Sequence, residues 1–142
     1  MSGKATEATS FLPESHPNYS EADTDLSYDP EAAKSLLEEA GAEDLSVTLL
    51  TTDHTWIEQL SPQIKNNLEA VGITVNIQSQ ASASLYSDYL DVEDPSFDVA
   101  LAPGDPSVFG QDPALLMNWW YGDNVWTKQR SFWQESHKEA FD

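Results

Sequence analysis

The chain has 142 residues, enough for one domain with a hydrophobic core, and its composition shows no break that would indicate two. It carries 25 Asp and Glu residues against 6 Lys and Arg, a formal net charge of −19, so we expect no nucleic-acid partner and no anionic membrane surface. There is no cysteine, which excludes disulfides, thiolate chemistry and cysteine-ligated zinc. The charge itself is best explained by a solvated acidic surface.

The N-terminal residues 1–27 are expected to form a largely irregular segment. Pro13 and Pro17 stand among scattered Ser, Thr and acidic residues with no sustained period. The first residues lack the apolar centre of a signal peptide, and no apolar run approaches the length of a membrane span. If the protein is exported, we expect its signal peptide to lie outside this sequence.

The organised part is predicted over residues 28–142, and it begins with a helix over residues 30–40. Asp29 supplies an N-cap acceptor, Pro30 suits the first helical position, and Gly41 marks the end. A β-compatible run follows over residues 45–51 and ends at a polar turn, Thr52-Asp53. The order is therefore one helix followed by one strand.

A second helix and strand repeat this order. Apolar residues recur every four positions up to Gly72, and since the pattern passes through Pro62 we predict one helix kinked there. The alternative is a short turn before Ser61, with Pro62 opening the main helix. Residues 73–78 alternate between apolar and polar, which predicts a strand with one buried face. The recurring apolar positions are Trp56, Leu60, Ile64 and Leu68.

Shorter sequence patterns than those of the first two helices and strands predict the remaining elements. Leu85 and Tyr89 suit a short helix within residues 81–90, and the nearly continuous apolar run 97–101 fits a central strand covered on both faces. A loop over residues 102–112 then leads to a helix over residues 113–120 capped by Asp112. A last helix after Thr127 or Ser131 stops in mid-turn, so we expect the domain to be truncated at its C-terminus.

No motif in the chain carries catalytic, nucleotide or metal chemistry. The loop 104–110 contains two glycines but lacks the Gly-Lys-Ser/Thr ending of a phosphate loop, and no serine lies in a Gly-x-Ser-x-Gly turn. The three histidines, His16, His54 and His137, are too far apart for a metal-binding motif. We therefore expect no cofactor, no metal and no enzymatic activity.

Aromatic residues are unusually dense over residues 119–133. Large rings with a polar edge suit a surface that recognises organic ligands, and they equally suit the closing of a hydrophobic core. Both interpretations stay open, and we expect some rings inside and one or two facing outward. The cluster comprises Trp119, Trp120, Tyr121, Trp126, Phe132 and Trp133.

Several segments together resemble the third domain of the family 5 solute-binding proteins, the extracytoplasmic oligopeptide-, dipeptide- and nickel-binding receptors of ABC importers. They are YDPEAAKSLLEEAG at 28–41, LSVTLL at 45–50, TVNIQ at 74–78 and FDVAL at 97–101, with GKATEATSFLP at 3–13. The resemblance implies an α/β lobe of the type II periplasmic-binding-protein fold, with a small mixed sheet flanked by helices. It further implies a C-terminal lobe that closes with a first lobe, not present here, on a peptide or similar small solute.

The resemblance also implies where the protein acts and which residues touch the ligand. Such a receptor is a periplasmic protein or a cell-surface lipoprotein, and it delivers its ligand to the membrane subunits of the importer. The nearest match to the Asp that pairs with a ligand's α-amine is Asp105, although Pro103-Gly104 stand where an aromatic residue is common. The alternative is that Asp105 only caps a turn. The expected ligand-binding residues are Asp105, Ser107, Phe109, Trp119 and Trp120.

Other functions are weighed against the receptor. A carbohydrate-binding or adhesion module would use the tryptophan cluster, and a regulator's ligand-sensing domain would use the same fold. An enzyme is the least favoured function.

Overall fold

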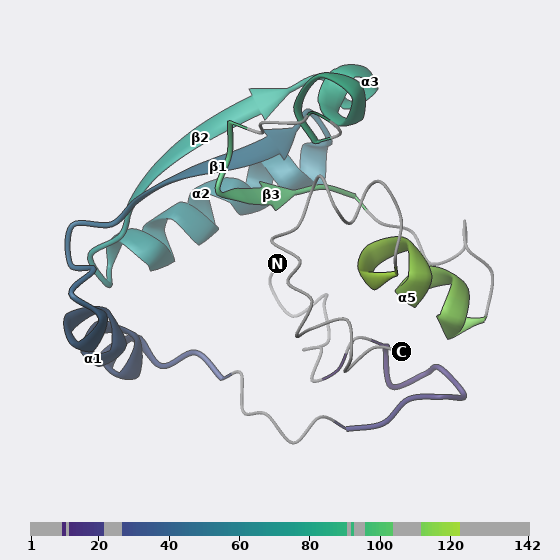
Figure 1. Cartoon of the computed structure of the whole chain (residues 1–142), viewed down its shortest axis with the longest axis horizontal. Helices are drawn as coiled ribbons and strands as arrows, with labels where there is room; N and C mark the ends of the chain where they lie inside the picture. Colours follow the sequence, from purple (N-terminus) through teal and green to yellow (C-terminus); the bar gives the residue numbers. More distant parts are fainter. Residues whose placement is uncertain are drawn as a thin grey trace.

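A three-stranded parallel sheet with helices beside it forms the organised part of the chain (Figure 1). The computed structural model describes residues 10, 12–21, 27–90, 92, 96–103 and 112–122. This arrangement confirms the predicted α/β class. The elements, in chain order, are α1 (Pro30–Ala40), β1 (Ser46–Thr52), α2 (Thr55–Glu69), β2 (Thr74–Gln80), α3 (Ser82–Ser84), the π-helix η1 (Leu85–Leu90), β3 (Val99–Leu101) and α5 (Pro113–Tyr121).

Helix α1 has the predicted bounds because its capping signals are local. Asp29 Oδ1 accepts hydrogen bonds from the backbone N–H groups of Glu31 at 3.1 Å and Ala32 at 2.9 Å. At the other end Gly41 adopts a left-handed conformation with φ of 63°, which a residue without Cβ adopts at little cost. Both ends of the helix are thus fixed by residues next to it in sequence.

Helix α2 runs without interruption through Pro62, as predicted, so the alternative of a separate turn before Ser61 is wrong. A proline inside a helix removes one backbone donor. The buried Ser61 hydroxyl donates to the carbonyl of Ile57 at 2.5 Å, one turn earlier. The buried Ser61 hydroxyl thus has its hydrogen-bond partner within the same helix.

Strand β1 is the centre of the sheet, whose order is β2-β1-β3. The residues of β1 pair with β2 along its whole length, from Ser46 opposite Thr74 to Thr52 opposite Gln80. The pairing of β1 with β3 covers three residues and begins with Leu49 opposite Val99. The three predicted strands are therefore confirmed, with bounds displaced by one or two residues.

Within the described residues, the run 97–101 does not occupy the predicted central position. Among the described strands β3 lies at the edge of the sheet, and Val99 remains 47% exposed. An apolar run predicts that its side chains are buried, but it does not predict how many strands pair with it. The position with both faces covered belongs to β1, where Leu49, Leu50, Thr51 and Thr52 are all buried.

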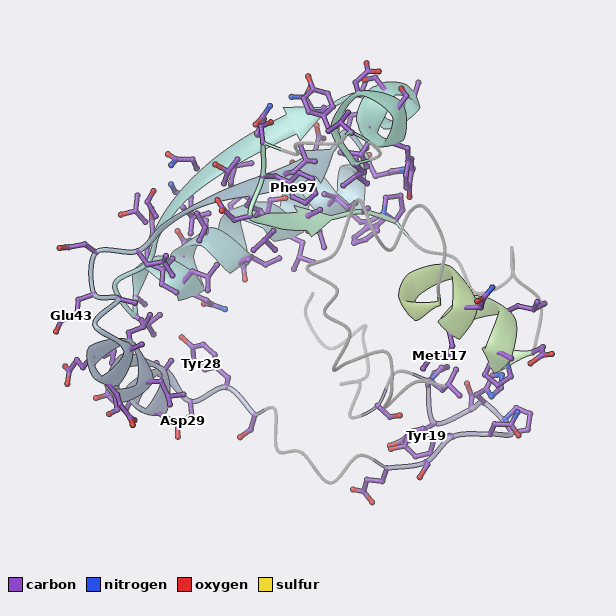
Figure 2. All side chains as sticks on the ribbon, in the orientation of Figure 1. Tyr19, Tyr28, Asp29, Glu43, Phe97 and Met117 are labelled. Atoms are coloured by element: carbon purple, nitrogen blue, oxygen red, sulfur yellow. The ribbon has the colours of Figure 1, made fainter. Side chains whose placement is uncertain are left out.

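The main core cluster joins β1 to the segment that connects β2 with β3. Leu50, Leu85 and Leu90 are buried together, and half-buried side chains pack around them. The predicted helix over residues 81–90 is one short α-helical turn followed by a π-helix, which places Leu85 and Leu90 on the same buried side at a spacing of five residues. Phe97 lies next to β3 in Figure 2. The half-buried members are Tyr86, Tyr89, Phe97 and Ala102.

Helix α5 begins where the sequence predicts. Asp112 Oδ1 accepts from the N–H of Ala114 at 2.9 Å, and Pro113 occupies the first turn. The helix ends one residue later than expected, at Tyr121. The further helix predicted after Thr127 or Ser131 lies outside the described residues.

Candidate functional site

The carboxyl edge of the sheet is the candidate functional site. Because all described strands are parallel, the ends of β1, β2 and β3 meet at one edge. The chain leaves β1 toward β2, then returns past β1 to form β3, so the direction of winding reverses at β1. Ligands of open α/β sheets bind outside the carboxyl ends of strands at such a reversal.

A hydrogen-bonded cluster joins the ends of β1 and β2 at this edge. Asp53 Oδ1 accepts from the backbone N–H of Ser82 at 3.0 Å, from the Ser82 hydroxyl, and from the Thr52 hydroxyl at 3.2 Å. The two hydroxyl oxygens lie 2.5 Å apart, and Thr52 is fully buried. The backbone N–H of Asp53 donates to the carbonyl of Gln80 at 3.1 Å. The cluster therefore fixes the first turn after β1 against the start of α3.

Asp53 carries a stable negative charge at this edge. The Ser82 hydroxyl and then the Ser82 backbone N–H donate to the carboxylate, and these bonds lower the pKa of Asp53 below its ordinary value of 3.8. The side chain is exposed, and each of these bonds goes to Oδ1. Asp53 is therefore ionised at neutral pH in a position open to solvent.

The start of the loop after β3 contacts η1 and the main core cluster. The Tyr86 hydroxyl donates to the carbonyl of Pro103 at 3.4 Å, and Ala102 packs against the main core cluster. Tyr86 belongs to η1, which follows directly from the α3 segment that holds Ser82. The loop over residues 102–112, which contains Asp105, thus begins at the carboxyl edge.

Two residues of this edge were missed or misjudged from the sequence. Asp53 was assigned only to a polar turn. Trp56 was assigned only to the apolar repeat of its helix, and it is 46% exposed in the first turn of α2. The signal that identifies Asp53 is its place directly after a predicted strand. Nothing in the local sequence identifies its partner Ser82, which lies 29 residues away.

The predicted ligand-binding residues are placed only in part. Asp105, Ser107 and Phe109 lie outside the described residues. Trp119 and Trp120 belong to helix α5, whose backbone is described there without their side chains. The role of these five residues in ligand binding stays a prediction.

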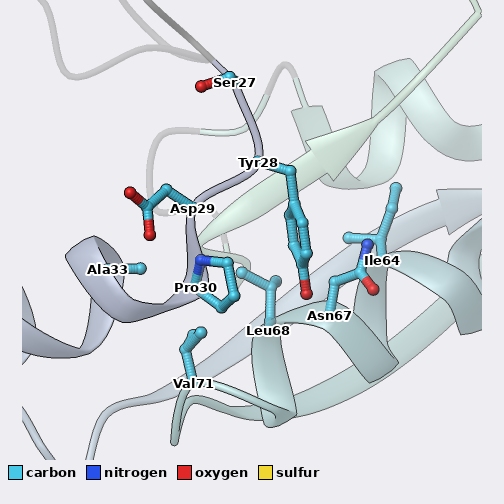
Figure 3. A pocket seen from close by; sticks show the side chains of 9 residues that line it. All are labelled: Ser27, Tyr28, Asp29, Pro30, Ala33, Ile64, Asn67, Leu68 and Val71. Carbon is cyan, nitrogen blue, oxygen red and sulfur yellow. The ribbon is translucent and has the colours of Figure 1, made fainter.

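A hollow lies between α1 and α2, away from the carboxyl edge. Its volume is about 490 Å³, and its walls are mainly apolar (Figure 3). Helix α1 contributes no buried residue to the fold. Since α1 and the end of α2 both precede strands, the hollow lies toward the amino ends of those strands. The lining residues are Ser27, Tyr28, Asp29, Pro30, Ala33, Ile64, Asn67, Leu68 and Val71.

Neither the carboxyl edge nor the hollow between α1 and α2 resembles a metal centre. In the part of the chain that the structure describes, no group of three or more His, Asp or Glu side chains is arranged to hold a metal ion. The polar groups at the carboxyl edge suit hydrogen bonding and charge pairing with an organic ligand.

Sequence comparison identifies the family. The family model of the bacterial extracellular solute-binding proteins, family 5, middle region, matches residues 1–127. The chain belongs to this family. Family 5 proteins bind solutes and are not enzymes, so the expected absence of catalysis follows from the match. No curated protein sequence matches the chain.

The fold of this family 5 chain is similar to that of a solved receptor. The crystal structure of the ABC transporter substrate-binding protein CtaP from Listeria monocytogenes superimposes with a TM-score of 0.75 at 18% sequence identity. The similarity covers 95% of this chain and 27% of CtaP, so the chain spans about a quarter of that protein's length. None of the helices described here is long and apolar enough to cross a membrane.

Proposed function

We propose that this chain is a ligand-binding lobe of an extracytoplasmic receptor that delivers a small solute to an ABC importer. The observation that carries the proposal is the family 5 match over residues 1–127, together with a carboxyl edge that presents polar groups at the reversal of the sheet. In this proposal residues 28–142 form the lobe and residues 1–27 lead into it. A second lobe of the same receptor closes over the ligand, and a lipid anchor holds the receptor at the cell surface.

The carboxyl edge favours a ligand with an ammonium group or several hydrogen-bond donors. Asp53 is ionised there. Lys34 and Lys65 are engaged elsewhere: Lys34 pairs with Glu31 at 3.0 Å, while Lys65 pairs with Glu69 at 2.9 Å and donates to a backbone carbonyl of β2 at 2.6 Å. Peptides and related amines fit an edge whose described charge is negative.

We further propose that Asp105, Ser107, Phe109, Trp119 and Trp120 complete the site beside this edge. The loop that contains Asp105 follows β3 directly, and its first residues are held by Tyr86. A carboxylate supplied by this loop would pair with the ligand's amine, and aromatic rings would cover the apolar part of the ligand. The proposal rests on the position of the loop in the chain and on the resemblance of its sequence to the family.

The test begins with the complete receptor and the solute that co-purifies with it, identified by mass spectrometry. Calorimetry then measures the affinity of that solute for the receptor and for the Asp105→Ala variant. If the solute bears an amine, loss of a charge-assisted contact should weaken binding by roughly 1.5–3 kcal/mol.

Asp44→Ala is the matched control. Asp44 is exposed in the turn before β1, at the amino edge of the sheet, so its removal changes net charge equally without touching the proposed site. Equal affinities for both variants, with the fold intact by circular dichroism, would leave Asp105 only a turn-capping role. Binding of immobilised polysaccharide by the receptor would instead favour the carbohydrate-binding module.

A further inference from the structure

The loop over residues 102–112 leaves β3 through two residues that the rest of the fold holds in place. Ala102 packs against the main core cluster. The carbonyl of Pro103 accepts a hydrogen bond from the Tyr86 hydroxyl at 3.4 Å. One apolar and one polar contact therefore hold the chain just before Asp105, which follows Pro103 by two positions.

The hydrogen bond from Tyr86 acts on a single peptide plane. The proline ring fixes φ of Pro103 near about −65°, so ψ is the backbone angle that stays free there. This angle sets the direction of the Pro103 carbonyl and, with it, the plane of the peptide that joins Pro103 to Gly104. Glycine accepts a wide range of φ, so the next residue gives the chain no direction of its own. The bond from Tyr86 thus supplies an orientation that the local sequence leaves open.

The π-helix η1 anchors Tyr86. Leu85 and Leu90, the first and last residues of η1, are both buried in the main core cluster, and the half-buried Tyr86 packs against it. An α-helix with about 3.6 residues per turn would place two residues five apart on different faces, whereas a π-helical turn brings them together. Segments of π-helix are rare and frequently lie at functional sites. Both ends of the element that carries Tyr86 are therefore fixed.

We infer that Tyr86 is a positioning residue for ligand binding: its hydroxyl orients the peptide after Pro103 and so places the Asp105 carboxylate for the ligand's amine. The inference rests on the proposed function, in which Asp105 pairs with that amine. Tyr86 acts through the loop and needs no contact with the ligand. Removal of its hydroxyl should therefore weaken binding only while the Asp105 carboxylate is present.

Tyr86→Phe in the complete receptor tests the inference, with Tyr89→Phe as the matched control. Tyr89 is half-buried against the same cluster, and its hydroxyl makes no hydrogen bond within the described residues. The probe is the solute that mass spectrometry identifies in the purified receptor, and calorimetry measures its affinity. Tyr86→Phe should weaken binding by roughly two- to tenfold, the net effect of one hydrogen bond. Tyr89→Phe should leave the affinity unchanged, and circular dichroism should show both variants folded.

A double-mutant cycle with Asp105→Ala separates positioning from a purely structural role. In the Asp105→Ala receptor, Tyr86→Phe should have little further effect, because the carboxylate that it places is already gone. Equal weakening with and without the Asp105 carboxylate would overturn the inference. If Asp105→Ala weakens binding and Tyr86→Phe does not, the inference fails and the proposed site stands. If Asp105→Ala leaves the affinity unchanged, the proposed role of Asp105 fails, and the inference fails with it.

Hydrogen exchange of the unmodified, solute-free receptor gives a measurement that requires no variant. Segments joined by packing and hydrogen bonds open as one unit when denaturant is added below the unfolding transition. The peptides that cover η1 and residues 101–105 should therefore open with the same dependence on urea. Opening of residues 101–105 at a lower urea concentration than η1 would show that Tyr86 does not hold the loop, and would overturn the inference.

Discussion

Truncation of Leu50 tests whether this residue anchors the main core cluster. Leu50 is 1% exposed and packs with Leu85 and Leu90, which belong to the segment between β2 and β3. Leu50→Ala removes three buried carbons, about 2.4 kcal/mol at about 0.8 kcal/mol each. A residual cavity of roughly 50 Å³ adds about 1.2 kcal/mol at roughly 24 cal/mol per Å³. The expected loss is therefore about 3.5 kcal/mol.

Urea denaturation followed by circular dichroism measures this loss, with Leu36→Ala as the matched control. Leu36 is 65% exposed on α1, so the same truncation there should change the unfolding free energy by less than about 0.5 kcal/mol. The Tm of Leu50→Ala should fall by roughly 10 °C, at about 3 °C per kcal/mol for a chain of this size. Equal losses in the two variants, or a loss below about 1 kcal/mol for Leu50→Ala, would refute the assigned core.

Three further predictions concern the edge, helix α1 and the isolated lobe. The folded-state pKa of Asp53 is lowered, so its stabilising effect is present above its ordinary pKa of 3.8 and is lost as the pH falls below that value. The stability of the wild type should therefore drop more steeply on acidification than that of Asp53→Asn in urea titrations, and parallel pH profiles would contradict this. Because α1 has no buried residue and borders the hollow, its amides should exchange faster than those of α2. Equal protection of the two helices would show that α1 is firmly packed. The 142-residue chain should bind the receptor's solute weakly, since half of the contacts are missing, and tight one-to-one binding in calorimetry would count against a receptor lobe.

The sequence predicted the elements whose signals are local. Asp29, Pro30 and Gly41 fix the ends of α1 through their own backbone and side-chain chemistry, and Asp112 fixes the start of α5. The strands were predicted from alternation and apolar runs, and the structure changes their bounds by only one or two residues. Short-range information was sufficient for these elements.

The errors arose where distant residues decide the outcome. The π-helical geometry of η1 and the exposure of Trp56 depend on what the surrounding fold covers, which no local pattern reports. The bond between Asp53 and Ser82 joins residues 29 apart, and that between Thr48 and Asp98 joins residues 50 apart. Among the described strands, β1 and not β3 lies at the centre, and this order likewise depends on pairing between distant segments.

The central claim is that the receptor holds its solute at the carboxyl edge of this sheet. Hydrogen exchange of the complete receptor, measured with and without the co-purifying solute, tests it most directly. The account predicts that the solute protects Asp53, Ser82 and the segment 102–112. Protection confined to the hollow between α1 and α2, or to the amino edge around Asp44, would contradict it.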